Sequence, residues 1–411
     1  MILSLSLLFL SIFFSGCGAA GGPGESAQAS ATADAVSAVS WNDLSADGEM
    51  DLKYADQFSV KYYKEGGSFA ESGEESGSAK EKDDYALATL QQEGDFLVVP
   101  EGKDVPSDIP DGTTVIRLPL SNVFVASSST MDFWRQLDAL PVVKMCATQE
   151  SGWSIPEIQK RMEDGDILYA GKYNAPDDEM LVDQDCDFII ENTMIYHAPD
   201  TLEKLEDLGF PVLVDRSSYE SHPMGRLEWV KLYGLFSGKG QEAEEFFDSQ
   251  DKTFTQIASG NASEENSGRT VAFFYVTSNG SVNVRKAGDY ISKMINLSGG
   301  QYVFQDLGDE DDNALSTVNM QMETFYNDAK DADILIYNST VEQPLSSMDD
   351  LLEKSSLFSD FKAVQEDNVF CTTQDMYQQP TGICQTMEDF NAIIQDPSVS
   401  NDELHYLYRV K

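Results

Sequence analysis

The sequence predicts an α/β protein of two lobes, each built around a mostly parallel sheet. Short apolar runs alternate with amphipathic segments from Thr113 to Val214, and the same alternation returns from Val271 to Thr373. This pattern is typical of strands that alternate with covering helices. Between the two series, Gln241–Ile257 carries apolar side chains at helical spacing, and such a helix is long enough to reach a second lobe. We therefore expect two lobes joined by a long helix.

The chain begins with a segment typical of a secretory signal. Ile2 to Phe14 are almost wholly apolar, and small residues lie before Cys17, as in a lipoprotein cleavage box. The apolar run is too short for an ordinary membrane span. Residues 1–17 are therefore predicted to be a signal peptide, and Cys17 is predicted to be the lipidation site. The lipid on Cys17 would anchor the protein to the cell membrane, so we expect an extracytoplasmic, membrane-attached location. No Lys or Arg precedes the run, so the coding start is expected upstream.

The remaining chain divides by composition. Residues 18–50 begin with a stretch rich in Gly, Ala and Ser and are predicted to be a flexible tether. Residues 51–238 would form the N-terminal lobe, including a small β region at 51–99 with a solvated acidic loop from Gly66 to Asp84. Residues 239–262 are predicted to be the interlobe helix and 263–411 the C-terminal lobe. Strands of the β region are expected at Phe58–Tyr63, Tyr85–Leu90 and Phe96–Val99.

Individual elements of the two lobes follow from apolar periodicity. In the first lobe we expect strands at Val115–Leu118, Val142–Met145, Ile167–Ala170, Phe188–Glu191 and Val212–Val214. Helices are expected between them, at Met131–Leu140, Pro156–Glu163, Asp177–Val182 and Thr201–Leu208. In the second lobe we expect strands at Val271–Val276, Ile334–Tyr337 and Val369–Thr373. Helices are expected at Tyr290–Leu297, Met322–Ala329 and Asp350–Leu357.

Charge and motif content exclude several functions. With 71 acidic and 27 basic residues, the net charge of −44 argues against nucleic-acid binding, and an anionic ligand would need local positive charge. The sequence has no Gly-x-Ser-x-Gly, HExxH or Walker motif, and only three histidines. The acidic run Asp309–Asp312 lacks EF-hand spacing. We therefore expect no enzyme, metal site or cofactor, and a monomer.

The cysteines are compatible with disulfides outside the cell. With Cys17 set aside, Cys146 and Cys186 lie in the first lobe and Cys371 and Cys384 in the second. Pairing within each lobe gives Cys146 with Cys186 and Cys371 with Cys384. Four free thiols are the alternative.

One stretch, Ser217 to Gly234, combines the features of a ligand site. It follows the apolar strand Phe210–Val214, and Pro223 stands where a helix would begin, so the loop lies at a strand's carboxyl end, where open α/β sheets bind ligands. Arg226, Trp229 and Tyr233 would share one helix face. They would suit an anionic, partly aromatic ligand. Alternatively, the two aromatic residues are core and Arg226 pairs with Glu220 or Glu228.

The same stretch resembles a family pattern. Glu220-x-x-Pro223-x-Gly225-Arg226-x-Glu228-Trp229, followed by Glu242-Ala243-Glu244-x-x-Phe247, resembles a motif of binding lipoproteins that serve ABC importers for iron complexes, namely ferric siderophores, haem and cobalamin. The resemblance extends from about Phe96 to the C-terminus. It implies two Rossmann-like lobes joined by a long interlobe helix, a ligand cleft between them, and an ABC permease with its ATPase as partners.

Among the ligands that the resemblance implies, a ferric siderophore is expected, because Arg and aromatic side chains suit anionic catecholate or hydroxamate complexes. Haem and cobalamin are the alternatives. A surface sensor or scaffold that kept the fold, or an enzyme acting on a cell-wall or metal-complex substrate, are the rival functions. His222 is expected to cap the helix at Pro223 or touch the ligand. The full set of candidate ligand-binding residues, gathered at strand ends and near the motif, is Arg226, Trp229, Tyr173, Tyr219, Glu220, His222, Met194, Lys172, Arg285, Met376 and Tyr377.

Two glutamates occupy places that in this family dock into permease arginines. Glu179 and Glu323 each lie at the start of a short predicted helix. The resemblance implies that they form the docking pair. Alternatively, they only stabilise the helix dipoles.

Overall fold

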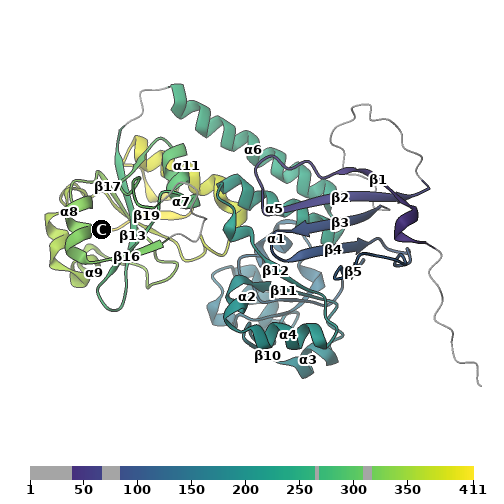
Figure 1. Cartoon of the computed structure of the whole chain (residues 1–411). Helices are drawn as coiled ribbons and strands as arrows, with labels where there is room; N and C mark the ends of the chain where they lie inside the picture. Colours follow the sequence, from purple (N-terminus) through teal and green to yellow (C-terminus); the bar gives the residue numbers. More distant parts are fainter. Residues whose placement is uncertain (1–38, 67–83, 264–267, 309–316) are drawn as a thin grey trace, which may run out of the picture.

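The protein is seen in a computed structural model that describes residues 39–66, 84–263, 268–308 and 317–411. The signal peptide, Cys17, most of the tether, most of the loop from Gly66 to Asp84 and the acidic run Asp309–Asp312 lie outside these ranges. Two lobes are joined by one long helix (Figure 1). This confirms the predicted two-lobed α/β class.

A five-stranded sheet precedes the first lobe. Its strands pair in chain order, antiparallel except for the parallel last pair. The predicted tether is wrong for its last residues, because 44–49 pair with the second strand. The segment after Thr113, expected in the lobe sheet, instead pairs with residues 96–99. The strands are β1 (Leu44–Glu49), β2 (Phe58–Glu65), β3 (Tyr85–Leu90), β4 (Gly94–Val99) and β5 (Thr114–Arg117).

The first lobe has a parallel sheet in the order β12-β11-β6-β7-β8. Its central strand β6 was missed, because three consecutive apolar residues are too few to show a period. The strands are β6 (Val123–Val125), β7 (Val143–Cys146), β8 (Leu168–Tyr169), β11 (Phe188–Asn192) and β12 (Val212–Asp215), with a small hairpin of β9 (Gly171–Lys172) and β10 (Ala175–Pro176). Its helices are α1 (Met131–Gln136), α2 (Pro156–Glu163), α3 (Asp178–Asp183) and α4 (Pro199–Asp207).

Two consecutive helices connect the lobes. Helix α5 (Pro223–Ser237) lies inside the first lobe, and α6 (Gly240–Ser263) runs from it to the second (Figure 1). Gly238, with a left-handed φ of 67°, ends α5 and turns the chain. A Cβ at Gly234 would lie 2.6 Å from that of Ala243, so glycine permits the close crossing of the two helices. The predicted interlobe helix is confirmed.

The second lobe has a mixed sheet in the order β16-β14-β13-β17-β18-β19, with β15 beside β13. Its centre is parallel, but β14, β16 and β19 pair antiparallel with their neighbours. The strands are β13 (Thr270–Val276), β14 (Val282–Arg285), β15 (Gln301–Tyr302), β16 (Thr317–Met320), β17 (Ile334–Tyr337), β18 (Val369–Thr372) and β19 (Leu407–Arg409). The helices are α7 (Tyr290–Leu297), α8 (Met322–Ala329), α9 (Met348–Lys354), α10 (Lys362–Gln365) and α11 (Ile383–Gln395).

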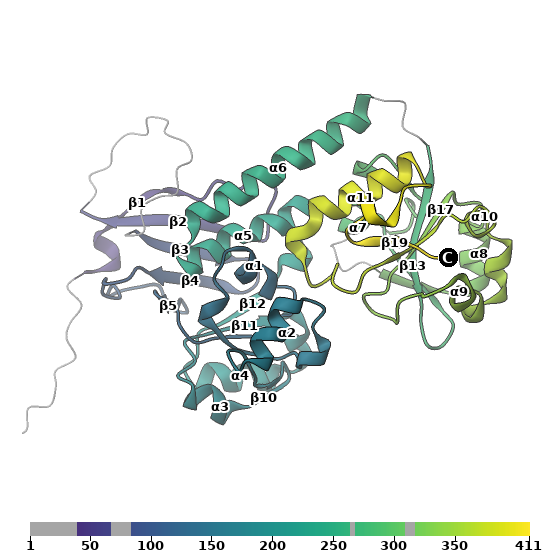
Figure 2. The same ribbon diagram turned by 180° about the vertical axis from the view of Figure 1, so that it is seen from behind.

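Helix α11 was not predicted, and it lies beside α6 in both views (Figures 1 and 2). One apolar core runs from the N-terminal sheet through α5 and α6 into the second lobe, and a second core covers the other face of the first lobe's sheet. Among the described helices, none combines the length and apolar character needed to cross a bilayer. Short 3₁₀ helices complete the fold at η1 (Trp41–Asp43), η2 (Leu140–Val142), η3 (Glu150–Gly152), η4 (Thr193–His197), η5 (Ser217–Tyr219), η6 (Ser356–Asp360), η7 (Pro380–Gly382) and η8 (Asn401–Glu403).

The disulfide prediction is wrong, because Cys146, Cys186, Cys371 and Cys384 are free and buried. Cys146 belongs to the large core and Cys186 to the core on the other face of the sheet. Cys371 lies in β18, whereas the Cys384 thiol on α11 donates to the Gln250 carbonyl at 3.3 Å. Burial raises the pKa of Cys146 to about 11. Spacing along the chain could not show on which face each thiol lies.

Candidate functional site

The loop between β12 and α5 is held by a buried carboxylate. Asp215, the last residue of β12, accepts hydrogen bonds from the Ser217 amide at 3.1 Å and the Ser217 hydroxyl at 2.6 Å. Its second carboxylate oxygen accepts a hydrogen bond from the hydroxyl of Tyr233, on α5, at 2.8 Å. Asp215 therefore fixes the loop and the rotation of α5 together, and with it the direction in which Arg226 projects.

His222 caps α5, which confirms that part of the prediction. Its Nδ1 accepts from the Met224 amide at 3.1 Å, so the ring carries no proton on that nitrogen. The ring stacks on Tyr54 at 4.6 Å between centroids and meets Phe254 edge-on. Burial lowers the pKa of His222 to about 4. A neutral, capping imidazole anchors the helix start.

Arg226 projects from the first turns of α5 into the junction between the lobes. Only 2% of its surface is exposed. Its guanidinium carbon lies 5.0 Å from the centre of the Tyr290 ring and 5.5 Å from that of Tyr377. Its Nε and Nη2 atoms have no hydrogen-bond partner within the described ranges. A buried cation with unused donors is costly unless something else pairs with it.

The second lobe adds a cation and a carboxylate near Arg226. Arg285 ends β14 and pairs with Asp289 at 3.3 Å. Asp289 caps α7 by accepting from the Ile291 amide at 2.8 Å, and Tyr290 is the first residue of that helix. Burial raises the pKa of Tyr290, while Arg226 and Arg285 both act to lower it, so both cations lie within electrostatic range of this ring. We call Arg226, Arg285, Asp289, Tyr290 and Tyr377 the interlobe cluster. Its formal charge is +1, in a protein that is strongly acidic overall.

A small cavity of about 10 Å³ lies against this cluster. Arg226 and Tyr290 line it with Met294, Met376, Gln379, Pro380 and three other residues of the second lobe. Of the predicted ligand residues, the structure therefore brings together Arg226, Arg285, Met376 and Tyr377.

Direct hydrogen bonds join the lobes around the cavity. Asp132, on α1, accepts from the Thr381 amide at 2.9 Å and from the Thr381 hydroxyl at 2.5 Å. Gln378 accepts from the Ser154 amide and donates to the Gly152 carbonyl, each at 2.8 Å. These bonds hold the lobes close together.

Other residues of the motif hold the N-terminal region onto α5. Glu228 accepts from the amides of Lys53, Tyr54 and Ala55 and from the Lys231 ammonium. Glu220 accepts from the amides of Asp56 and Gln57 and from the Trp229 indole. The Trp229 ring is fully buried and meets Phe58 edge-on at 5.0 Å.

Gly225 is part of the same junction. A Cβ there would lie 2.9 Å from a Glu220 oxygen and 3.0 Å from the Tyr54 carbonyl. Glycine thus allows residues 53–57 to approach the helix. In this structure Glu220, Trp229 and Gly225 hold the protein together, and Glu220 pairs with Trp229 rather than with Arg226.

A further cluster lies near the carboxyl end of the first lobe's sheet. The Arg216 guanidinium lies over the Tyr219 ring at 4.3 Å and close to the Tyr196 hydroxyl, which donates to Glu93. Met194 is half exposed. Lys172 and Tyr173 lie at the small hairpin before α3, with Tyr173 packed against the second core. Figures 1 and 2 both place this hairpin at the end of the first lobe away from α5, so the structure does not bring Lys172 and Tyr173 into the interlobe cluster.

The two predicted docking glutamates occupy matching local positions. Glu179 is the second residue of α3 and Glu323 the second residue of α8, and both are exposed. Each could therefore meet a partner without displacing a neighbour.

Sequence reasoning missed Asp289 and Tyr290. The sequence does contain a signal for them, because Asp289 directly precedes an apolar helical segment and can cap that helix. Asp289 also follows Arg285 by four residues, a spacing at which the two side chains can form an ion pair. No group of three or more His, Cys, Asp or Glu side chains in the ranges that the structure covers is arranged to hold a metal ion.

The sequence matches the profile described as periplasmic binding protein over residues 128–376, which is more than half of the chain. The chain therefore belongs to the periplasmic binding protein family. Its members and structural neighbours are solute-binding proteins, and the two-lobed architecture agrees with them.

Similar proteins support this assignment. An uncharacterized lipoprotein of Methanocaldococcus jannaschii is 26% identical over 371 residues, covering 87% of this chain and 85% of that protein. A periplasmic haem binding protein from Pseudomonas aeruginosa has a TM-score of 0.54 at 14% identity, covering 71% of this chain and 98% of that one. The molybdate periplasmic binding protein of Haemophilus influenzae has a TM-score of 0.52 at 12% identity, covering 67% and 86%. At these identities the solved structures show a shared fold.

Proposed function

We propose that this protein is the extracytoplasmic solute-binding lipoprotein of an ABC importer, and that it captures an anionic iron complex, foremost a ferric siderophore, between its lobes. The observation that supports this most strongly is Arg226. It is a buried guanidinium at the lobe junction with two nitrogen atoms lacking hydrogen-bond partners in the described chain. The rings of Tyr290 and Tyr377 lie close to Arg226, and Arg285 is a second cation in the same cluster.

The chemistry of the interlobe cluster suits an anionic ligand. A guanidinium presents fixed donors to carboxylate, catecholate or hydroxamate oxygens, and a charge-assisted bond is roughly twice as strong as a neutral one. The Tyr290 and Tyr377 rings both lie within cation–π distance of this guanidinium and would pack against an aromatic or planar ligand. Because the protein carries a net charge of −44, such a ligand gains its attraction only at short range from these cations.

Ligand entry requires the lobes to separate. The cavity of about 10 Å³ holds at most a water-sized group, whereas drug-sized ligands occupy roughly 300–1,000 Å³. Opening would break the bonds of Asp132 to Thr381 and of Gln378 to Ser154. Helix α6 crosses between the lobes, so it would limit how far they move apart. Ligand bound by Arg226 and Arg285 would then replace the lost contacts.

Delivery to the membrane would use the remaining predicted features. Lipidated Cys17 would hold the protein at the membrane surface. Glu179 and Glu323, one on each lobe, would dock into a cationic surface of the permease, and the partner ATPase would supply the energy. Two docking charges on separate lobes would let the permease distinguish a closed, loaded protein from an open one.

Intrinsic fluorescence tests the ligand site. Trp153 is buried and directly precedes Ser154, which bonds to Gln378 of the other lobe, so lobe movement should change its emission. The full-length chain would be titrated with ferric catecholate, ferric hydroxamate, haem, cobalamin and molybdate. We expect saturable binding of one ferric complex, weakened about 10- to 100-fold by Arg226→Ala, as for loss of a charged hydrogen bond. Arg226→Lys should recover part of the affinity.

The matched control is Arg117→Ala, which removes an exposed arginine on β5. Its affinity should equal that of the unaltered chain. Binding of haem, cobalamin or molybdate alone would replace the siderophore as ligand. Equal affinity in the Arg226→Ala and Arg117→Ala proteins would refute the role of Arg226, and no response to any ligand would contradict the import function.

A further inference from the structure

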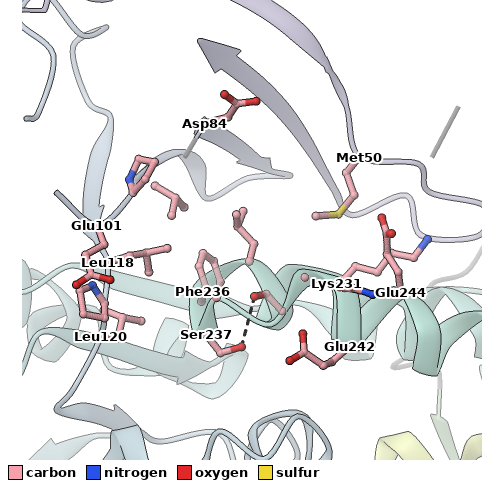
Figure 3. A pocket seen from close by; sticks show the side chains of 18 of the residues that line it. Met50, Asp84, Glu101, Leu118, Leu120, Lys231, Phe236, Ser237, Glu242 and Glu244 are labelled. Atoms are coloured by element: carbon pink, nitrogen blue, oxygen red, sulfur yellow. Dashed lines mark hydrogen bonds between the residues drawn. The ribbon is translucent and has the colours of Figure 1, made fainter. Parts of the chain in front are cut away.

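A second cavity lies away from the lobe junction. It is enclosed by the N-terminal sheet, the segment around Pro119, the end of α5 and the start of α6, and its volume is about 740 Å³. Figure 3 shows Met50 and Asp84 on the side of the sheet and Phe236, Glu242 and Glu244 on the helical side of the same space. None of the residues of the interlobe cluster lines it. Its volume falls within the range of small-molecule sites.

Part of the wall of this cavity is apolar. The sheet contributes Tyr62 and Val98, the following segment contributes Leu120, and α5 contributes Leu235 and Phe236. Such side chains would bury a hydrocarbon body, at about 25 cal/mol for each Å² removed from water.

The polar part of the cavity is strongly acidic. Among its described lining residues, the single cationic side chain is Lys231, which is held by the Asp51 carbonyl and Glu228 and lies over the Phe247 ring. The carboxylates come from the sheet, from the segment after it and from α6, namely Asp84, Glu101, Glu242, Glu244 and Glu245. Glu242 also pairs with the Lys239 ammonium at 3.1 Å, and Glu245 accepts from the Gln241 amide at 2.8 Å. Counted with both ammonium groups, the five carboxylates still leave the cavity with a net negative formal charge.

The negative charge of the cavity acts on Tyr62, one of its lining residues. Its pKa is raised to about 12, mainly by burial and in smaller part by the carboxylates of Glu244 and Asp84. Two acidic groups from different elements therefore act on one hydroxyl inside the cavity. A ligand ammonium near Tyr62 would be attracted by both carboxylates and by the electron-rich ring face.

We propose that this cavity is a second ligand site, which takes an organic cation with an apolar body. A bare metal ion does not fit, because no metal-type cluster of side chains occurs in the described parts of the chain. An organic anion would meet the carboxylates with no unpaired cation to receive it. The site faces the N-terminal sheet, so the cation would bind without passing between the lobes.

Isothermal titration calorimetry of the full-length chain tests this site with three probes that share one tail. Decyltrimethylammonium, neutral decyl glucoside and decyl sulfonate would each be added below the concentration at which they form micelles. We expect one decyltrimethylammonium per chain, with the sulfonate at least about 10-fold weaker, because the carboxylates attract the ammonium and repel the sulfonate. The glucoside should lie between them.

Variants locate the site. Glu101→Gln combined with Glu244→Gln should weaken the ammonium about 3- to 30-fold and leave the glucoside unchanged. Leu235→Trp should reduce binding of all three probes, because the larger ring fills the cavity. The matched control Glu157→Gln removes an exposed charge on α2, outside the lining, and should change nothing.

Near-ultraviolet circular dichroism would show that each variant keeps its packing. Equal affinity for ammonium and sulfonate, an unchanged ammonium affinity in the double glutamate variant, or unaltered binding in Leu235→Trp would each overturn the proposal. Absence of saturable ammonium binding would also overturn it. None of these outcomes bears on the ferric-complex titration, which reports on the interlobe cluster.

Discussion

The buried charges on two faces of helix α5 differ in how fully they are hydrogen-bonded. On one face, Glu228 receives three backbone amides and the Lys231 ammonium. On the other, Arg226 is just as buried but leaves two nitrogen atoms without a hydrogen-bond partner in the described chain. The first charge is satisfied by its own protein. The second lies at the junction between the lobes.

This difference distinguishes the residues of the motif that stabilise the fold from the residue that we propose binds the ligand. A charge whose bonding capacity is filled within the fold stabilises that fold, whereas a charge kept partly unpaired retains binding energy for a ligand. By this criterion Glu220, Glu228 and Trp229 connect the N-terminal region to α5, whereas Arg226 is the residue of the motif that we propose binds the ligand. The following predictions test the contrast through free energies of unfolding.

Removing the satisfied charge should have the largest effect. Glu228→Ala leaves the amides of residues 53–55 and the Lys231 ammonium without their acceptor, and we expect a loss of about 3–5 kcal/mol in urea unfolding followed by circular dichroism. The exposed control Glu157→Ala should remain within about 0.5 kcal/mol. A loss below about 1 kcal/mol for Glu228→Ala would mean that water replaces the carboxylate.

The cap of α5 should make stability depend on pH. The pKa of His222 falls from 6.5 in the unfolded chain to about 4 in the fold, so the folded state binds fewer protons between these values. Its contribution is present above pH 6.5 and is lost as pH falls through about 4, amounting to at most about 3 kcal/mol. His222→Asn keeps a capping side chain but should remove this part of the slope. An identical slope in both proteins would contradict the assignment.

The close approach at Gly225 should be intolerant of a methyl group. Gly225→Ala places a Cβ 2.9 Å from Glu220 and 3.0 Å from the Tyr54 carbonyl, and we expect a loss of about 1–3 kcal/mol. Gly260→Ala on α6, where nothing lies within 4 Å, is the matched control and should gain up to about 1 kcal/mol. Similar values for the two variants would show that residues 53–57 move aside easily.

Removing the unpaired charge should have the smallest effect on stability. Arg226→Met loses two cation–π contacts but also relieves a buried guanidinium, so we expect the free energy of unfolding to change by less than about 1 kcal/mol. Urea unfolding followed by circular dichroism, as for Glu228→Ala, would measure this change. A loss above about 3 kcal/mol would place Arg226 with the structural residues and would end the contrast between the two faces.

Local features of the structure were readable from the sequence. The bounds of α2, α7, α8 and β17 agree with the predicted ones, because each is set by apolar periodicity and by local caps such as Pro156. The start of α5 at Pro223 and its cap at His222 were also predicted. Arg226 was found because a family motif marks its position.

The predictions that failed concern contacts between distant parts of the chain. Residues 44–49 joined a sheet because of a partner at 61–65, and the segment at 114–117 paired with β4 rather than with the lobe's strands. The cysteines were assigned to disulfides from their order along the chain, but Cys146 and Cys186 pack in different cores.

The sequence by itself determined the family, the two-lobed class and most helix positions, because hydrophobic period, caps and motif residues act over a few neighbouring positions. Only the tertiary structure decided which charges of α5 are satisfied. The backbone amides that Glu228 accepts from lie more than 170 residues away, at 53–55, and the rings that contact Arg226 lie in another lobe. Whether a buried charge is paired depends on these long-range contacts, which no local pattern records.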